Sequence, residues 1–289
     1  MSPAPRGRLI WNADDFGFSG AVNEGIALAH RTGLVRGASL LAGGEAFDGA
    51  VALAKMLPEL DVGVHLAAVA ERPILAPEML PHLAGRGGRL PESHVAFLWR
   101  YLAGPLRAAT VEAEWEAQIA RVRDAGLTPV YLDSHQHLHV LPGLMEATLR
   151  LAKRFGIRAV RTPGDFVPGR PGPVRGALLG ALFALGRRAR AMARREGLFT
   201  ADGTLGILDA GRLDAARIRS WLPLLALRPW ATLELVSHPG MGEPPGSAAS
   251  LWGYHWADEM EAARNESLAE ALRDCRIDVV GYRDCLGRR

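Results

Sequence analysis

The stretch that decides the fold is residues 9–17, LIWNADDFG, in which a short apolar run leads directly into two adjacent carboxylates. Such a run predicts a buried β-strand near residues 8–13. Asp14 and Asp15 then stand where the strand ends, which is where α/β proteins keep their catalytic and ligand-binding residues. Because adjacent side chains point in different directions at such a bend, one carboxylate can hold a cation while the other accepts a proton.

Similar apolar runs recur along the chain, and most of them are followed by a helical spacing of apolar residues. The further strands are expected near residues 36–41, 61–66, 129–134, 157–161, 205–208, 232–237 and 277–281. The helical patterns cover residues 20–32, 45–56, 111–125, 143–155, 212–226 and 258–274. About eight strands that alternate with helices predict an α/β fold, a single-domain, closed or nearly closed TIM-like (β/α) barrel over residues 1–289. A doubly wound open sheet is the main alternative.

Two stretches interrupt this alternation and are expected to be loop insertions, at about residues 68–110 and 239–257. The first contains several prolines and the glycine-rich stretch 85–88. The second contains Pro244-Pro245-Gly246 and the aromatic stretch 252–256. Long loops in compact domains are usually functional or disordered. The aromatic residues favour the rim of a substrate site for the second insertion.

Composition excludes several classes of protein. With 289 residues, of which 48% are hydrophobic and 22% charged, the chain can bury a sizeable core. The formal net charge is only +3, and no segment interleaves basic with aromatic residues, so nucleic-acid binding is not expected. Nearly all the positive charge is arginine, since Lys55 and Lys153 are the only lysines. The basic isoelectric point is therefore weak evidence for nucleic-acid binding.

The expected location is the cytoplasm. The first residues lead straight into a strand without an apolar segment typical of a signal peptide. Cys275 and Cys285 are the only cysteines, which is far from the density of a disulfide scaffold, so we expect reduced thiols. The longest apolar stretch, residues 177–186, is too short to span a bilayer, which needs about 20 residues.

Histidines follow three of the other predicted strands. His65 ends the run DVGVHL, three histidines alternate in DSHQHLH at residues 133–139, and His238 follows LELVS. Each of these histidines alone is readily explained as a structural residue. The carboxyl ends of parallel strands meet on one face of a barrel, however, so we expect the aspartates and histidines to converge there.

One carboxylate with two imidazoles is a common ligand set for a divalent metal, and it leaves positions open for water and substrate. Such a site suits hydrolysis, because the metal acidifies its bound water and polarises a carbonyl. A second carboxylate that does not bind the metal can remove the proton of the water. A histidine from a different strand can then protonate a departing amine.

These motifs resemble those of a known family, the YdjC-like carbohydrate deacetylases of the ChbG/HpnK group. The matching stretches are residues 12–17, 63–66, 133–139, 161–163 and 237–240, with residues 281–284 similar to the C-terminal strand of the family. Each stretch alone is weakly specific, but their order and spacing together are specific. The resemblance covers nearly the whole chain.

The resemblance implies a distorted (β/α) barrel that removes acetyl groups from N-acetylated amino sugars and releases acetate. It assigns the metal to Asp15, His65 and His135, the general base to Asp14 and the general acid to His238. The single divalent metal ion of this group is usually taken as magnesium. Two imidazoles and one carboxylate suit zinc or another transition metal at least as well.

Three further residues keep alternative roles. Arg161 can bind substrate by orienting a hydroxyl, or its charge can hold Asp14 ionised, and a purely structural ion pair is equally consistent. His137 can bind substrate, or together with His139 it can fix the tautomer of a metal-bound imidazole. His139 can also replace His135 as a ligand, which the sequence leaves open.

The substrate class is divided between two branches of the family. Residues 206–214 and 160–165 resemble the hopanoid-biosynthesis branch, whereas residues 132–135 are closer to the chitooligosaccharide type. The substrate is thus a glycan that contains N-acetylglucosamine or a hopanoid-linked N-acetylglucosamine. Within residues 174–199 an apolar run leads into five arginines between residues 187 and 195, a pattern of a helix that makes peripheral contact with the inner face of an anionic membrane. The alternative is an outer barrel helix with a solvated arginine end.

Other functions remain open at this level. A metal-dependent phosphoesterase or a sugar isomerase can use a similar site on a similar barrel. A catalytically silent sugar-binding protein is a candidate from a different class, which the intact set of aspartates and histidines argues against. The oligomeric state is also open, with a homodimer as one alternative.

Overall fold

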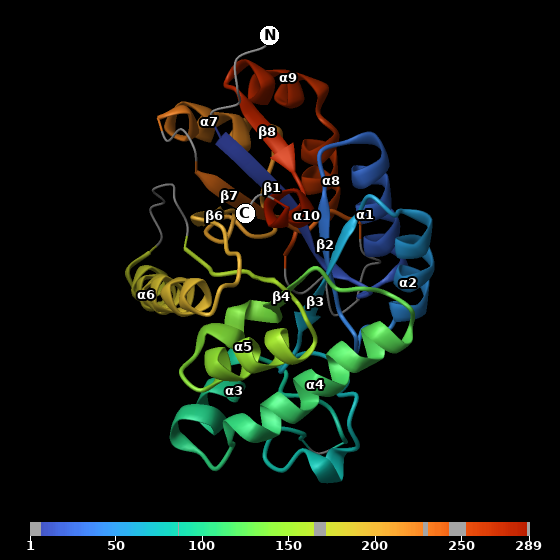
Figure 1. The fold of residues 1–289 in the computed structure, drawn as a ribbon, viewed down its shortest axis with the longest axis vertical. Helices are drawn as coiled ribbons and strands as arrows, with labels where there is room; N and C mark the ends of the chain where they lie inside the picture. The colour runs from blue at the N-terminus through green and yellow to red at the C-terminus, as the bar shows by residue number, and fades with distance from the viewer. Residues whose placement is uncertain (1–6, 86, 165–171, 228–230, 243–252, 288–289) are drawn as a thin grey trace.

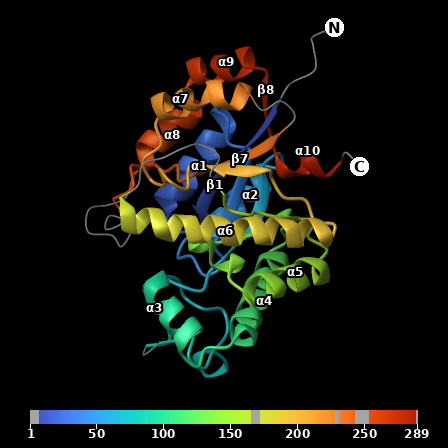
Figure 2. The ribbon, with the colours of Figure 1, turned by 90° about the vertical axis from the view of Figure 1, so that its left-hand side faces the viewer.

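A computed structural model describes residues 7–85, 87–164, 172–227, 231–242 and 253–287 of the chain. Strands and helices alternate along most of it (Figures 1 and 2). The strands are β1 (Gly7–Phe16), β2 (Gly37–Leu40), β3 (Asp61–Leu66), β4 (Tyr131–Ser134), β5 (Ala159–Val160), β6 (Gly203–Leu205), β7 (Thr232–Ser237) and β8 (Ile277–Val280). The α-helices are α1 (Gly20–Thr32), α2 (Phe47–Met56), α3 (His94–Leu98), α4 (Ala108–Asp124), α5 (Leu144–Arg154), α6 (Pro173–Arg195), α7 (Ala215–Ala226), α8 (Trp256–Arg264), α9 (Glu266–Asp274) and α10 (Tyr282–Leu286). Short helical turns of other types are η1 (Pro77–Met79), η2 (Trp99–Ala103) and η3 (His135–Val140).

The strands form one parallel sheet that curls into a distorted TIM-like barrel. The order along the sheet is β5-β4-β3-β2-β1-β7-β6. The two ends approach each other, because Phe199, shortly before β6, forms a parallel bridge to Ala159 of β5. β8 lies off this path and pairs with the first half of β1, whereas β2 pairs with its second half. The predicted (β/α) barrel is confirmed.

The predicted elements differ from the observed ones in a few places. β6 ends at Leu205, before the predicted stretch 205–208 is complete, because Gly206 takes the left-handed φ of 97°. The predicted helix over 258–274 is two helices, since Asn265 ends α8 and its side chain caps α9 by accepting a hydrogen bond from the Leu268 amide at 2.8 Å.

The structure describes most of the first predicted insertion and less than half of the second. The insertion at 68–110 contains η1, α3 and η2. Most of the insertion at 239–257, including Pro244-Pro245-Gly246 and Trp252, lies outside the described residues. The assignment of residues 1–289 to one domain stays a prediction.

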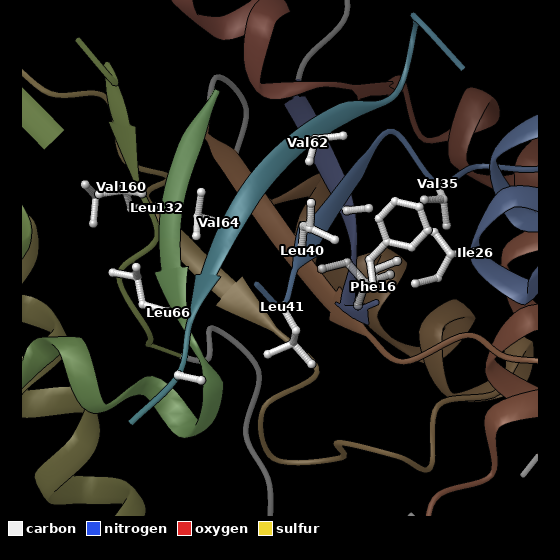
Figure 3. Packing of buried hydrophobic residues seen from close by; sticks show 14 of the residues in the cluster. Phe16, Ile26, Val35, Leu40, Leu41, Val62, Val64, Leu66, Leu132 and Val160 are labelled. Atoms are coloured by element: carbon white, nitrogen blue, oxygen red, sulfur yellow. The ribbon is translucent and has the colours of Figure 1, made fainter. Parts of the chain in front are cut away.

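Alternate residues of the strands face the helices and the barrel interior. Phe16 of β1 packs with Ile26 of α1 and with Val35, on the helix side of the sheet (Figure 3). The interior holds a smaller apolar cluster that includes Ile10, Tyr131 and Tyr282. The rings of the two tyrosines stack with centroids 4.0 Å apart. Tyr282 belongs to α10, which therefore covers the end of the barrel where Ile10 and Tyr131 lie. Inward-facing positions farther along the strands are polar and build the site described below.

No helix among the described residues is long and apolar enough to cross a membrane.

Candidate functional site

The two adjacent aspartates reach the same space because β1 is irregular at its end. The pairing of β1 with β2 shifts register between Ala13 and Phe16, and Asp15 has a φ of 63°. Aspartate tolerates this left-handed conformation better than most residues. In a regular strand the two side chains would point to opposite faces. Here Nε2 of His65 lies 4.0 Å from Oδ2 of Asp14 and 3.6 Å from Oδ1 of Asp15.

Asp15, His65 and His135 converge from the ends of β1, β3 and β4. His65 lies near the end of β3, and His135 directly follows β4. Each side chain offers one ligand atom, and the three atoms all lie within 4.8 Å of one another. Both carboxylate oxygens of Asp15 are buried, and neither accepts a hydrogen bond of good geometry among the described residues, although Nδ1 of His135 lies 3.2 Å from Oδ1. A buried carboxylate without donors is costly, and a bound cation would remove that cost. The three residues therefore fit a divalent metal.

Asp133 orients His65 for this arrangement. Oδ1 of Asp133 lies 2.8 Å from Nδ1 of His65, which leaves Nε2 directed toward Asp15. A carboxylate behind an imidazole is the usual support of a metal-bound histidine. Burial lowers the pKa of His65, but the negative charges of Asp133 and Asp14 outweigh it and raise the pKa to about 9. The surroundings of Nε2 thus favour positive charge, which a metal ion can supply in place of the proton.

Arg161 is fully buried beneath the aspartates and binds three carboxylates. Its Nη1 and Nη2 each lie 2.7 Å from one oxygen of Asp14, Nη1 also lies 2.7 Å from Oδ2 of Asp133, and Nε lies 2.8 Å from Oε1 of Glu234. Together with Asp15, the site holds four buried carboxylates and one guanidinium. Unbalanced buried charge is strongly unfavourable, so this excess of carboxylates also favours a bound cation.

These contacts favour one of the roles that the sequence leaves open for Arg161. Among the described residues, its guanidinium pairs with three carboxylates, and the side chain is 0% exposed. Burial raises the pKa of Asp14, but the positive charge and hydrogen bonds of Arg161, together with His65, hold that pKa well below its usual range. Arg161 thus keeps Asp14 ionised and fixes its orientation.

A layer of polar side chains supports the aspartates from the neighbouring strands. The Asn12 amide donates hydrogen bonds to Asp14 at 3.0 Å and to Ser39 at 2.8 Å, and the Ser39 hydroxyl donates to Asp133 at 2.7 Å. The Tyr131 hydroxyl donates to Asn12 at 2.5 Å. A Cβ atom on Gly63 would lie 2.3 Å from the ring of Tyr131, so only glycine leaves room for that ring.

The histidines after β4 have separate positions. The ring of His139 is fully engaged, because Nε2 lies 2.8 Å from the backbone oxygen of Arg161 and Nδ1 lies 2.6 Å from the Ser134 hydroxyl. Nε2 must donate to the carbonyl, so Nδ1 accepts from Ser134. Burial lowers the pKa of His139 to about 4, in agreement with a neutral ring. Its neutral ring supports the backbone at Arg161 and has no nitrogen left for a metal.

His137 is half-buried, and its Nδ1 has no hydrogen-bond partner among the described residues. Gln136 and His137 both have left-handed φ values, 55° and 56°. Consecutive left-handed residues without glycine are strained, and such strain is commonly found at functional sites. The role of His137 in binding substrate stays a prediction.

His238 lies directly after β7 and is surrounded by polar and aromatic residues. Its ring centroid is 4.7 Å from that of Tyr254 and 6.3 Å from that of Trp256. Burial lowers the pKa of His238, but Glu259 and then Asp15 and Asp14 outweigh it and raise the pKa. The charges of the aspartate pair therefore reach His238, as expected if the strand ends converge.

Sequence reasoning gave no role to Asp133, Glu234 or Glu259. Glu234 carries a usable signal, since a charged residue inside the apolar run LELV predicts a buried partner. Asp133 stands two residues before His135, which on a strand directs it to the barrel interior. Glu259 carries no such signal, because it lies in the first turn of a helix far along the chain.

Comparison with known proteins identifies the family. A family model described as YdjC-like protein matches residues 8–274. The chain belongs to the YdjC-like family. The YdjC-like chain is 30% identical over 276 residues to a mouse (Mus musculus) protein named carbohydrate deacetylase, a match that covers 86% of each chain. It is 40% identical over 155 residues to a carbohydrate deacetylase of Geobacillus stearothermophilus, covering 53% of this chain and 60% of that protein.

Some curated relatives match over only part of their length. The match with the carbohydrate deacetylase of Brevibacillus brevis, 38% identical over 159 residues, also covers 60% of that protein. Among solved structures, one described as a cellobiose-phosphate cleavage protein from Enterococcus faecalis aligns with a TM-score of 0.74 and 23% identity. That alignment covers 97% of the YdjC-like chain and 99% of the other. It shows a common fold.

Proposed function

We propose that this chain is a metal-dependent hydrolase that removes the acetyl group from an N-acetylated amino sugar and releases acetate. The observation that carries the proposal is the buried group of Asp15, His65 and His135 beside Asp14, in a chain whose relatives are named carbohydrate deacetylases. A divalent ion held by these three side chains would act as a Lewis acid on the acetyl carbonyl and lower the pKa of a water molecule.

Asp14 and His238 then handle protons on either side of the reaction. Asp14 stays ionised because Arg161 binds both of its oxygens, and it accepts a proton from the attacking water. A carboxylate of such low basicity needs an acidified water as its partner. His238, whose pKa is raised, donates a proton to the sugar nitrogen as the C–N bond breaks, so that a free amine leaves.

The substrate proposed is N-acetylglucosamine in a glycan or linked to a lipid such as a hopanoid. The lipid-linked alternative is supported by α6. Val174 and Leu178, in the first half of α6, are 75% and 63% exposed. Arg187 and Arg195 are exposed farther along the same helix. Apolar side chains followed by arginines suit peripheral contact with an anionic membrane, at its cytoplasmic face.

A homodimer stays a prediction.

The experiment combines metal analysis with product analysis. Purified protein is analysed for bound metals, and acetate release is measured with chitooligosaccharides and with lipid-linked N-acetylglucosamine. The proposal predicts about one divalent ion per chain and one acetate for each free amine formed. The choice between magnesium and zinc follows from the metal analysis, where two imidazoles favour zinc or another transition metal. Release of phosphate, or an aldose–ketose change without acetate, would contradict the proposal.

A further inference from the structure

Glu259, in the first turn of α8, lies against His238 and binds its backbone. Oε2 of Glu259 accepts a hydrogen bond from the His238 amide at 2.5 Å, and Oε1 accepts one from the Leu213 amide at 3.1 Å. The side chain of Glu259 is 1% exposed. Both carboxylate oxygens are therefore fixed by backbone donors, which hold a negative charge at a defined place beside the strand end.

The same carboxylate faces the imidazole of His238. Nδ1 of His238 lies 3.8 Å from Oε2 of Glu259, and this nitrogen is buried without a hydrogen-bond partner among the described residues. The rings of Tyr254 and Trp256 lie against the imidazole, with centroids 4.7 Å and 6.3 Å away. These rings restrict rotation of the imidazole, so its Nδ1 side stays toward Glu259.

We propose that Glu259 is a positioning residue that holds His238 in its protonated form, with Nδ1 toward the carboxylate and Nε2 left for the substrate. The inference rests on the proposed role of His238 as general acid. A histidine with the ordinary pKa of about 6.5 is mostly neutral above pH 7 and cannot donate. A fixed carboxylate behind the ring stabilises the imidazolium, as in other acid–base sites with an orienting carboxylate.

Other charged groups also face His238. Asp14 and Asp15 of β1 act on it in the same direction as Glu259, and the phenol of Tyr254 lies over its ring. Asp14, however, pairs with Arg161, whose positive charge offsets that of the carboxylate, and Asp15 lies 3.6 Å from Nε2 of His65. Apart from His238, the partners of Glu259 among the described residues are two backbone amides, and no arginine or lysine pairs with it there.

The test is an NMR titration of the His238 imidazole in the wild type and in Glu259→Gln, with the signal assigned by its loss in His238→Asn. We expect the pKa of His238 to fall by about one unit in E259Q, which corresponds to a tenfold loss of imidazolium at alkaline pH. The alkaline limb of the pH–rate profile should move to lower pH by the same amount. Asp258→Asn is the matched control, because Asp258 lies in the same turn but is exposed and pairs with His255. It should change neither value.

A second variant separates the effect of the lost charge from that of a destabilised fold. The glutamine amide of E259Q must face one of the two backbone donors, which can destabilise the protein. Glu259→Asp keeps the charge, so the pKa of His238 should stay closer to that of the wild type. The inference is overturned if folded E259Q titrates like the wild type, or if E259D lowers the pKa as much as E259Q does. The titration needs no turnover. A lowered pKa in E259Q would therefore support the inference even if no acetate is released, an outcome that refutes the proposed function alone.

Discussion

Replacement of Arg161 by methionine tests the charge balance beneath the site. Arg161→Met keeps a side chain of similar length but removes the one guanidinium that, among the described residues, binds Asp14, Asp133 and Glu234. Removing one partner from a buried ion pair typically costs about 3–5 kcal/mol, because the remaining charges stay buried without compensation. For a chain of this size that loss lowers the melting temperature by roughly 10 °C.

The loss should depend on pH in a defined direction. In the folded wild type the pKa of Asp14 is held well below its usual value of about 3.8. The ionised carboxylate therefore stabilises the fold fully above about pH 3.8, and this stabilisation is lost as the pH falls through the lower pKa of the folded state. Without Arg161, the effect of burial is opposed only by the charges of His65 and His238, so the pKa of Asp14 rises. The folded variant then takes up protons as the pH falls from 7.5 to 5, and the difference from the wild type shrinks.

The assay is denaturant unfolding of both proteins at pH 7.5 and pH 5, in the presence of a chelator so that metal binding does not contribute. Arg150→Met serves as the control. Arg150 also forms a bidentate ion pair, with Glu112, but its side chain is 59% exposed. That variant should lose about 1 kcal/mol or less. A loss of similar size for R161M, or a larger loss that does not change with pH, would refute the role of Arg161 as the compensating charge.

The remaining predictions concern the metal, the base and the membrane. Asp15→Ala should lose the bound metal, because it removes the one carboxylate of the three-residue group, and metal analysis of the purified variant checks this. Asp14→Asn should keep the metal and lose ~10²–10⁴ in turnover, and wild-type activity in this variant would exclude Asp14 as the base. Charge reversal at Arg187 and Arg195 should abolish co-sedimentation with anionic vesicles, and a wild type that never sediments would contradict membrane contact.

Much of the fold could be predicted because the pattern of the strands is strong. Short apolar runs separated by helical spacing predicted the eight strands to within a few residues, and the parallel sheet follows from their alternation with helices. The convergence of Asp15, His65 and His135 follows from the same logic, since each lies at the carboxyl end of a strand. Both interpretations of residues 174–199 predicted a helix, and α6 runs from Pro173 to Arg195.

The finer parts of the site depend on geometry that a pattern does not encode. The irregular end of β1 and the left-handed backbone of Asp15 direct the side chains of Asp14 and Asp15 to the same site. Two consecutive aspartates in a sequence do not indicate this backbone geometry. His135 and His139 are equivalent in the alternating run, but Ser134 and the backbone of Arg161 occupy both nitrogens of His139. The contact of Glu259 with His238 joins residues from separate elements and follows only from their packing.

The most direct test of the central claim is a measurement of acetate released from N-acetylglucosamine oligomers and lipid-linked N-acetylglucosamine by metal-free protein to which a divalent metal is restored. The proposed site predicts that one divalent ion per chain binds to the wild type, that acetate and free amine then form in equal amounts, and that Asp15→Ala neither binds the ion nor releases acetate. Wild-type protein that binds one ion per chain but releases no acetate from either substrate class, with any divalent metal, would contradict it.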